Sequence, residues 1–347
     1  MESTKTVITK ETKNKISVDY EGKLSVKERL MKKLSASNTW ITAVVNVLRF
    51  VLMLGVSYVI LFPFISKIAG SFMNKDDVID ATVSLIPKDF TLEQYKYIII
   101  DNKYFEAFLN TLLLSILCAL IQTFVACLVG YGLSKFKFKG NKLIMLIVVV
   151  TMIIPHNTLN ISMLRHFESF DLGYIMSLGG SGLLTGIFGK IELTNTFWPF
   201  IILSLGGLAF KNGLYIYMMR QFFKGVPDEL EESAYVDGSG TFRTFLQIIL
   251  PLSIPMMITI FLFAFSWQWT DQFYTGLFFM GKDAPWMMPD VISQVPEHLK
   301  TSYAGQSLYY TVIQNTAGIM VIFPLVIMYL FCQKYLVQGI ERSGLVG

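Results

Sequence analysis

Residues 226–255 read Val-Pro-Asp-Glu-Leu-Glu-Glu-Ser-Ala-Tyr-Val-Asp-Gly-Ser-Gly-Thr-Phe-Arg-Thr-Phe-Leu-Gln-Ile-Ile-Leu-Pro-Leu-Ser-Ile-Pro, a charged stretch between two long apolar segments. Pro227 suits a first helical position, because its missing N–H costs nothing there, and the helix dipole favours the acidic residues that follow it. Gly238 can take the left-handed conformation that ends a helix, and an amphipathic run follows with Phe242 and Phe245 on one face. The stretch therefore predicts a helix, a sharp turn and a second helix outside the lipid, with an apolar side that needs a partner.

The rest of the chain is apolar enough to cross a membrane several times. Of its 347 residues, 53% are hydrophobic and 16% are charged, and the mean hydropathy is +0.52. This composition excludes an ordinary soluble fold of this length, and a transmembrane helix needs about 20 predominantly apolar residues. We therefore predict an all-α polytopic membrane protein. Its six transmembrane helices are expected at about 50–68, 108–133, 143–164, 197–217, 251–280 and 311–335.

Basic residues predict the orientation of these helices. The first 49 residues carry ten lysines or arginines, four lysines follow the second apolar segment without an acid among them, and Lys334 and Arg342 follow the sixth. The positive-inside rule puts all three regions in the cytoplasm, and the alternation of spans then puts 226–255 there as well. The net charge of +4 follows from this topology and gives no reason to invoke nucleic acid.

No catalytic or metal site is visible in the sequence. Cys118, Cys127 and Cys332 lie within predicted spans without metal-ligand or redox spacing, and the three histidines are scattered. The stretch 182–190 is rich in glycine, but its spacing is wrong for a phosphate loop and Ile191 replaces the required Ser or Thr. The chain thus has no apparent means of hydrolysing ATP, and energy for transport must come from another subunit or an ion gradient.

The stretch 226–255 also carries a multi-position motif. Its spacing resembles the EAA loop of the permease subunits of binding-protein-dependent ABC importers, closest to the carbohydrate (maltose-permease-like) branch. Ser233 replaces the first alanine of that motif and is small enough to keep close packing, while Asp237 is expected to cap or pair locally. An ordinary amphipathic connector is the alternative. The matching residues are Glu232, Ala234, Gly238, Ile248, Leu250 and Pro251.

Other stretches extend the resemblance from about residue 50 to the C-terminus. They are 87–95, 108–111, 130–140, 154–155, 219–223 and 333–347. The charge pattern predicts a basic cytoplasmic tail (1–41), and the resemblance implies a six-helix permease domain (42–336) followed by a cytoplasmic C-terminal tail (337–347). Within the permease domain it implies a coupling loop at 220–250 and an external insertion at about 173–196. The tail 1–41 is expected to be solvated or loosely apposed to the membrane, with an ATPase contact as the alternative.

The resemblance also implies how the coupling loop works. It docks as a coupling helix in a cleft of a separate ATPase, where Glu232 makes a polar contact, Ala234 packs closely and Gly238 sets the angle between the two helices.

Polar residues at membrane depth are candidates for the substrate pathway, because their burial in lipid is costly. Trp269 and Asp271 occupy the place of a Trp-Asn-acid triplet in the fifth span of the resembled permeases, and the indole of Trp269 could stack on sugar C–H bonds. Packing is the alternative for Trp269, and pairing with a base on a partner subunit is the alternative for Asp271. Lys211, beside Asn212, suggests an unwound or water-facing turn, or else snorkels to the interface. The fourth candidate is Asn315.

These features predict a permease subunit, not an enzyme, forming half of the pathway for a sugar or oligosaccharide in a bacterial cell membrane, with both termini cytoplasmic. The implied partners are a homologous permease subunit, a cytoplasmic ATPase dimer that binds the ATP and Mg, and an extracytoplasmic solute-binding protein. No cofactor is expected in this chain. An ion-coupled secondary transporter acting alone is the alternative, although no convincing internal repeat supports it. A membrane enzyme should show a cluster of catalytic residues, and the sequence has none.

Overall fold

The computed structural model describes residues 8–11, 17–20, 37–171, 190–295, 299, 303 and 305–342. Most of the predicted tail 1–41, much of the predicted insertion at 173–196, the stretch 182–189 and residues 343–347 lie outside these ranges. The chain divides into two compact units, Met1–Ser66 and Lys67–Gly347.

The first unit contains two strands and most of one long helix. Strands β1 (Ile8–Glu11) and β2 (Ser17–Tyr20) pair antiparallel, with Ile8 opposite Tyr20. The hairpin lies in the predicted tail 1–41, outside the permease domain, whose described residues are all-α as predicted. Ile8 and Thr9 in β1 and Val18 and Tyr20 in β2 favour strand pairing. Helix α2 (Ser37–Gly70) is longer than the predicted span 50–68.

Four helices in the described part of the chain are long and apolar enough to cross a membrane, and a fifth span exists if one sharply bent pair is counted. The four are Ile41–Gly70, Tyr104–Lys135, Thr241–Trp269 and Ser307–Leu336. These segments agree with the first, second, fifth and sixth predicted spans, although the fifth ends at Trp269 and not near residue 280. The full count of six is not reached, because the third and fourth predicted spans are interrupted.

The third predicted span bends by 94° between α6 (Asn141–Ile153) and the segment that follows it, η1 (His156–Leu159) with α7 (Asn160–Glu168). Ile154 and Pro155 are both extended, with ψ of 122° and 125°. A proline lacks the N–H that a helix needs and disfavours helical geometry in the residue before it. Pro155 therefore accounts for the bend.

The fourth predicted span, 197–217, is two helices, α9 (Trp198–Leu205) and α10 (Asn212–Lys224). Residues 206–211 between them include Gly207 at φ +70° and Lys211 at φ +65°. These left-handed conformations cannot continue a right-handed helix, so the span breaks next to Lys211.

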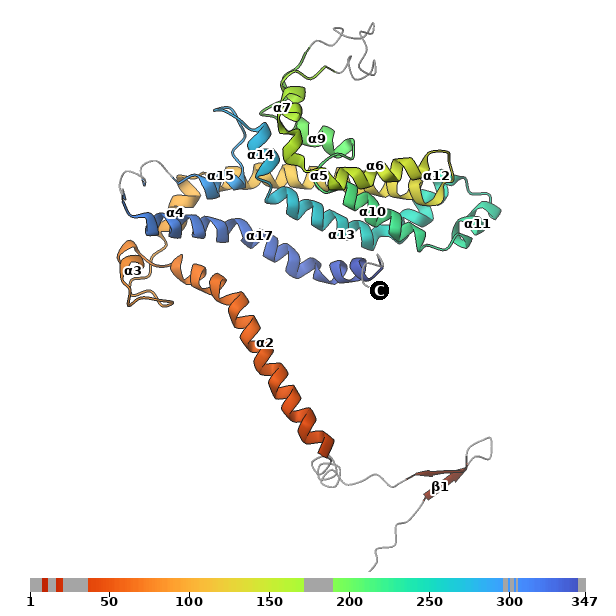
Figure 1. Ribbon diagram of the computed structural model, residues 1–347, viewed down its shortest axis with the longest axis horizontal. Coiled ribbons are helices and arrows are strands. Elements are labelled where there is room, and N and C mark those ends of the chain that lie inside the picture. Colours follow the sequence, from red (N-terminus) through yellow and green to blue (C-terminus); the bar gives the residue numbers. More distant parts are fainter. Residues whose placement is uncertain are drawn as a thin grey trace, which may run out of the picture. The chain divides into compact units, whose positions relative to one another are not determined.

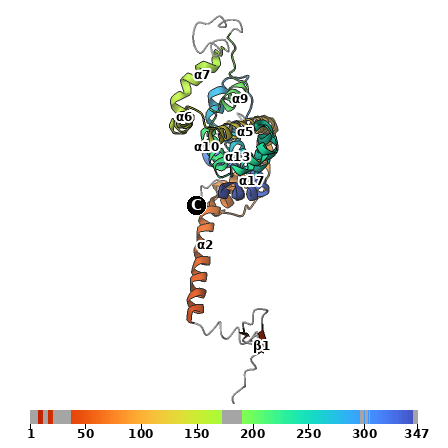
Figure 2. The ribbon, with the colours of Figure 1, turned by 90° about the vertical axis from the view of Figure 1, so that its right-hand side faces the viewer.

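The core of the second unit forms around α5 (Tyr104–Lys135). Helix α5 packs against α10 and α13 (Leu250–Trp269), and α13 packs in turn against α17 (Ser307–Arg342), as Figures 1 and 2 show. Close approach of α5 and α10 depends on Gly130, where an added Cβ would lie 2.6 Å from the Cβ of Met219. Burial of apolar surface between these helices holds the bundle together.

Shorter helices cap the bundle. In Figure 1, α3 (Lys75–Ile79), α4 (Glu93–Ile100) and α15 (Met288–Ser293) gather at one end, while α11 (Glu229–Val236) and α12 (Thr241–Thr244) lie at the other. Helix α14 (Phe273–Phe278) lies near α7 and α9. The end with α11 also holds the C-terminal ends of α5 and α17 and the start of α6.

Candidate functional site

The motif loop, which we define as residues 226–251, folds as a helix, a turn and a second helix, as its sequence predicts. Helix α11 ends at Val236, Gly238 follows with φ +81°, and α12 begins at Thr241. A π-helical turn, η2 (Phe245–Ile249), then joins α12 to α13. The positive φ at Gly238 is the left-handed conformation that closes α11, and it sets the direction in which the chain re-enters the bundle.

Helix α11 has one buried face and one open face. Glu231 and Ala234 are buried, whereas Glu232 and Ser233 are exposed. Val236 is 88% exposed, and across the turn Phe242 is 73% exposed. Tyr235, which is also exposed, and the acidic Glu232, which stands one helical turn before Val236, complete this exposed surface. We call this surface the open face.

The buried face of α11 is held to the end of α5 by a polar cluster. Lys135, whose side chain is only 7% exposed, donates its Nζ to the Val226 carbonyl at 2.7 Å and to Asp228 Oδ1 at 2.5 Å. The same Nζ lies 3.9 Å from Glu231 Oε2, and the Tyr131 hydroxyl donates to Glu231 Oε1 at 2.7 Å. These five residues form what we call the α5–α11 lock. The Lys135 hydrogen bond lowers the pKa of Asp228 below its ordinary value.

An aromatic cluster supports the lock. The Tyr131 ring lies 4.8 Å from the ring centroid of Phe245 and 5.5 Å from those of Phe136 and Phe223. Phe245 is buried at the start of η2. The π-helical turn and α11 therefore share one support at the end of α5.

The sequence did not predict the lock. The motif singled out Glu232, but the buried acid is the neighbouring Glu231. Lys135 served only as one of the basic residues that predict the orientation of the spans, although its side chain binds the motif loop. Tyr131 and Lys135 stand four residues apart and so share a helix face. That spacing was the single available signal.

The other motif residues lie along the loop without forming one cluster. Asp237 is an exposed C-cap whose N–H donates to the Ser233 carbonyl at 3.1 Å. Ile248 and Leu250 are partly buried against the main core, and Pro251 is exposed in the first turn of α13.

The four predicted pathway residues are not brought together. Trp269 is fully buried: its Nε1 donates to the Val321 carbonyl at 2.9 Å and its ring stacks on Phe265 with centroids 5.6 Å apart. This geometry is that of a packing residue. Asp271 accepts hydrogen bonds from backbone N–H groups in the first turn of α14, including Thr275 at 3.0 Å, and so caps that helix. Asn315 is half-buried on α17.

Lys211 lies at the break of the fourth predicted span and contacts two aromatic rings. Its Nζ lies 4.9 Å from the ring centroid of Phe210 and 5.1 Å from that of Trp267. Trp267 is 48% exposed. Of the two tryptophans at the end of α13, Trp267 therefore presents its indole outward while Trp269 packs inward.

A cavity of about 130 Å³ opens beside Lys211. His156, from the bend of the third predicted span, lies on its wall, and His156 Nδ1 is 2.6 Å from the Tyr274 hydroxyl. Asn212 is fully buried, and its Oδ1 has no hydrogen-bond partner among the described residues. The lining consists of Thr151, Met152, His156 and residues 207–214.

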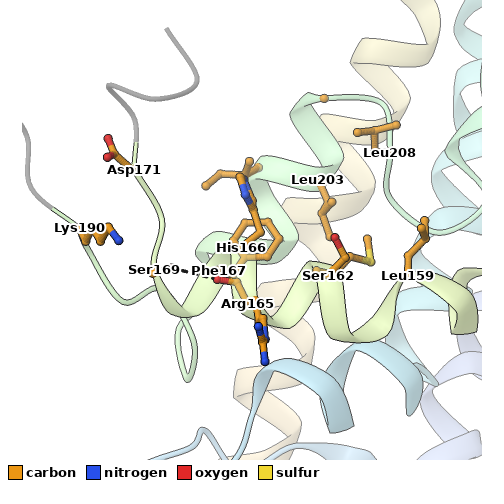
Figure 3. Close-up of a pocket in the computed structure, with 13 residues that line it drawn as sticks. Leu159, Ser162, Arg165, His166, Phe167, Ser169, Asp171, Lys190, Leu203 and Leu208 are labelled. Atoms are coloured by element: carbon orange, nitrogen blue, oxygen red, sulfur yellow. Dashed lines mark hydrogen bonds between the residues drawn. The ribbon is translucent and has the colours of Figure 1, made fainter. Parts of the chain in front are cut away.

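A larger cavity, about 720 Å³, lies between α7 and α9 (Figure 3). Leu159, Phe167 and Leu203 contribute an apolar lining, and Arg165 points away from Leu203 and Leu208 in that view. Lys190 and Asp171, at its edge, flank a part of the chain outside the described residues.

Comparison with known proteins identifies the family. Residues 122–342, more than half of the chain, match the family described as the binding-protein-dependent transport system inner membrane component. The chain belongs to this family. It is therefore a multi-pass membrane subunit of a transport system.

Several curated relatives are named as carbohydrate permeases. The chain is 24% identical over 292 residues to the polygalacturonan/rhamnogalacturonan transport system permease protein YtcP of Bacillus subtilis, covering 82% of this chain and 92% of the relative. It is 25% identical to the maltodextrin transport system permease protein MalD of Streptococcus pneumoniae, covering 86% of this chain and 94% of the relative. The predicted maltose-permease-like branch is thereby confirmed.

A solved structure shares the fold. It is a bacterial ABC transporter involved in the import of the acidic polysaccharide alginate; one of its chains matches with a TM-score of 0.65 and 20% identity, covering 86% of this chain and 98% of that one. The permease fold is confirmed by this likeness together with the family.

Proposed function

We propose that this family member is the permease subunit of an ATP-driven importer and forms half of the transmembrane pathway for a sugar or oligosaccharide. The open face of the motif loop carries the proposal: exposed apolar side chains lie beside acidic Glu232 on a helix whose other face is anchored in the bundle. A separate ATPase dimer, which binds the ATP and Mg, would cover this face. A homologous permease subunit and an extracytoplasmic solute-binding protein would complete the assembly.

The energetics favour a partner for the open face. Burying a side chain such as Val or Phe gains about 1.5–3 kcal/mol relative to exposure. Val236, on α11 outside the candidate spans, is 88% exposed, and Phe242, at the start of the segment Thr241–Trp269, is 73% exposed. Glu232 would add a polar contact at the edge, where Ser233 leaves room for close approach. Gly238 would hold the angle between α11 and α12.

The lock supplies a mechanical link from the ATPase to the membrane. Movement of α11 would be transmitted through Glu231 and Lys135 to the end of α5, which packs against both α10 and α13. Closure of the ATPase over nucleotide would thus rock the bundle between two orientations of its pathway, which is alternating access.

The relatives and the charges support the proposed cargo and orientation. Relatives named for polygalacturonan, maltodextrin and starch degradation products support an oligosaccharide. A solved relative in complex with an alginate pentasaccharide-bound periplasmic protein supports delivery by a binding protein. The basic end of α5 and the motif loop share one end of the bundle, which we place in the cytoplasm of a bacterial cell, with both termini on that side.

Val236→Asp tests this proposal. A charge in the centre of an apolar contact should abolish recovery of the ATPase with the tagged chain, and sugar uptake with it, while the chain remains in the membrane. Ile86→Asp is a matched control, because Ile86 is also exposed, at 83%, but lies far from the motif loop in sequence. Uptake by the isolated chain without any ATPase, or unchanged ATPase recovery in Val236→Asp, would contradict the proposal.

A further inference from the structure

Two helix breaks meet beside Lys211. The bend at Ile154 and Pro155 brings His156 against Phe210, with ring centroids 5.0 Å apart, and Lys211 caps the start of the 13-residue helix α10. Polar backbone left free by a broken helix is tolerated at membrane depth only where protein or a water-filled cavity satisfies it. Here the cavity of about 130 Å³ lies at that place.

The charge of Lys211 is uncompensated. None of the ion pairs among the described residues includes it. Its ammonium lies over the rings of Phe210 and Trp267, and such contacts stabilise a cation only weakly. The N-terminal end of the α10 helix dipole adds further positive potential. The site thus attracts an anion.

A second feature asks for a hydrogen-bond donor. Asn212 Oδ1 is buried without a partner in the described part of the chain, on the wall of the same cavity. A buried acceptor left unpaired is costly. A ligand that satisfies both Lys211 and Asn212 must therefore carry an anionic group and a hydroxyl close together.

Trp267 specifies the shape of that ligand. The indole is 48% exposed and lies beside Lys211, outside the residues that line the cavity, with the ammonium over its ring. Its exposed part is a flat apolar surface that suits the C–H face of a sugar ring. A neutral sugar would use Trp267 and Asn212 but leave the ammonium unpaired. The cavity is small enough that only one end of a sugar unit can enter it.

We propose that Lys211, Asn212 and Trp267 form a subsite for a uronic acid unit of the transported oligosaccharide. Lys211 pairs with the carboxylate, Asn212 accepts from a ring hydroxyl and the indole of Trp267 stacks on the ring. This subsite rests on the proposed function, because it assumes that a saccharide passes along this chain.

The experiment compares two probes in proteoliposomes that hold the complete transporter and its binding protein: trigalacturonate, and the same trisaccharide with its carboxylates methyl-esterified. Lys211→Gln should lower uptake of the acid about tenfold to 100-fold, because charge-assisted bonds are lost, and leave the ester unchanged. Lys211→Arg should keep most of the acid uptake. Trp267→Ala should lower both probes, since stacking does not depend on charge.

Lys282→Gln is the matched control, because it removes an exposed lysine outside the cluster and should change neither probe. Equal losses of acid and ester in Lys211→Gln would overturn the subsite, as would a wild-type transporter that carries only the ester. Recovery of the ATPase with the chain is measured in parallel. Its absence from the wild type would contradict the proposed function itself, whereas its presence with a failed probe comparison would overturn the subsite alone.

Discussion

Replacing Lys135 by methionine should release α11 from the end of α5. Methionine keeps an unbranched side chain of similar length, so the apolar contacts of the lysine stem are largely retained. The substitution removes the ammonium that donates to the Val226 carbonyl at 2.7 Å and lies 3.9 Å from Glu231 Oε2. The perturbation is therefore confined to the polar part of the lock.

The size of the effect follows from the burial of these groups. A hydrogen bond from a charged donor contributes about 1.5–3 kcal/mol, and leaving a buried group under-satisfied costs about 1–3 kcal/mol. Glu231 keeps its Tyr131 hydrogen bond, and the two effects are not additive. We expect α11 to open about 2–4 kcal/mol more easily, which is roughly 30-fold to 700-fold. The exposed Asp228 carboxylate adds little, because water screens it.

Hydrogen exchange measures this opening directly. In the assembled complex, protection of the amides of 229–236 should fall by that factor in Lys135→Met. The number of ATP molecules hydrolysed per sugar transported should rise, because closure of the ATPase then moves α11 without moving α5 to the same extent. Lys137→Met is the matched control, since Lys137 is exposed, and it should leave exchange in this helix unchanged. Wild-type protection of 229–236 in Lys135→Met would refute the reasoning that the lock holds α11.

Two other substitutions test the backbone geometry. Gly238→Asp forces a side chain into φ +81° at about 1–2 kcal/mol and adds a charge to the motif loop, so transport should be lost with the spans still inserted. The control Gly140→Asp, at φ +99°, should transport normally. Normal ATPase recovery together with transport in Gly238→Asp would count against the coupling role. Gly130→Ala places a methyl 2.6 Å from Met219 Cβ and should destabilise the protein by about 1–3 kcal/mol, which lowers its unfolding temperature. The control Gly132→Ala has open space around the added methyl and should not lower it. Equal unfolding temperatures for Gly130→Ala and the wild type would disprove close packing of α5 on α10.

The breaks in the third and fourth predicted spans show where reasoning from the sequence reached its limit. Hydropathy counts apolar residues over a window and does not register a bend, so 143–164 and 197–217 both passed as continuous spans. Pro155 was visible in the sequence, but many membrane helices accommodate a proline through neighbouring groups. The structure shows that this proline ends its helix with a 94° bend, and that the bend brings His156 against Phe210 on the wall of a cavity.

The sequence by itself determined the membrane class, the helix–turn–helix of the motif loop and the family, because apolar runs, a helix-start proline with acids and a turn glycine act over a few residues. Tertiary structure decided which side of each helix is buried. Glu231 and not Glu232 meets Lys135, and Trp267 and not Trp269 faces outward. Glu231 is covered by Tyr131, 100 residues away along the chain, and Trp269 by Val321, 52 residues away. A local sequence pattern contains no information about such distant neighbours, so it cannot predict which of two nearby side chains is buried.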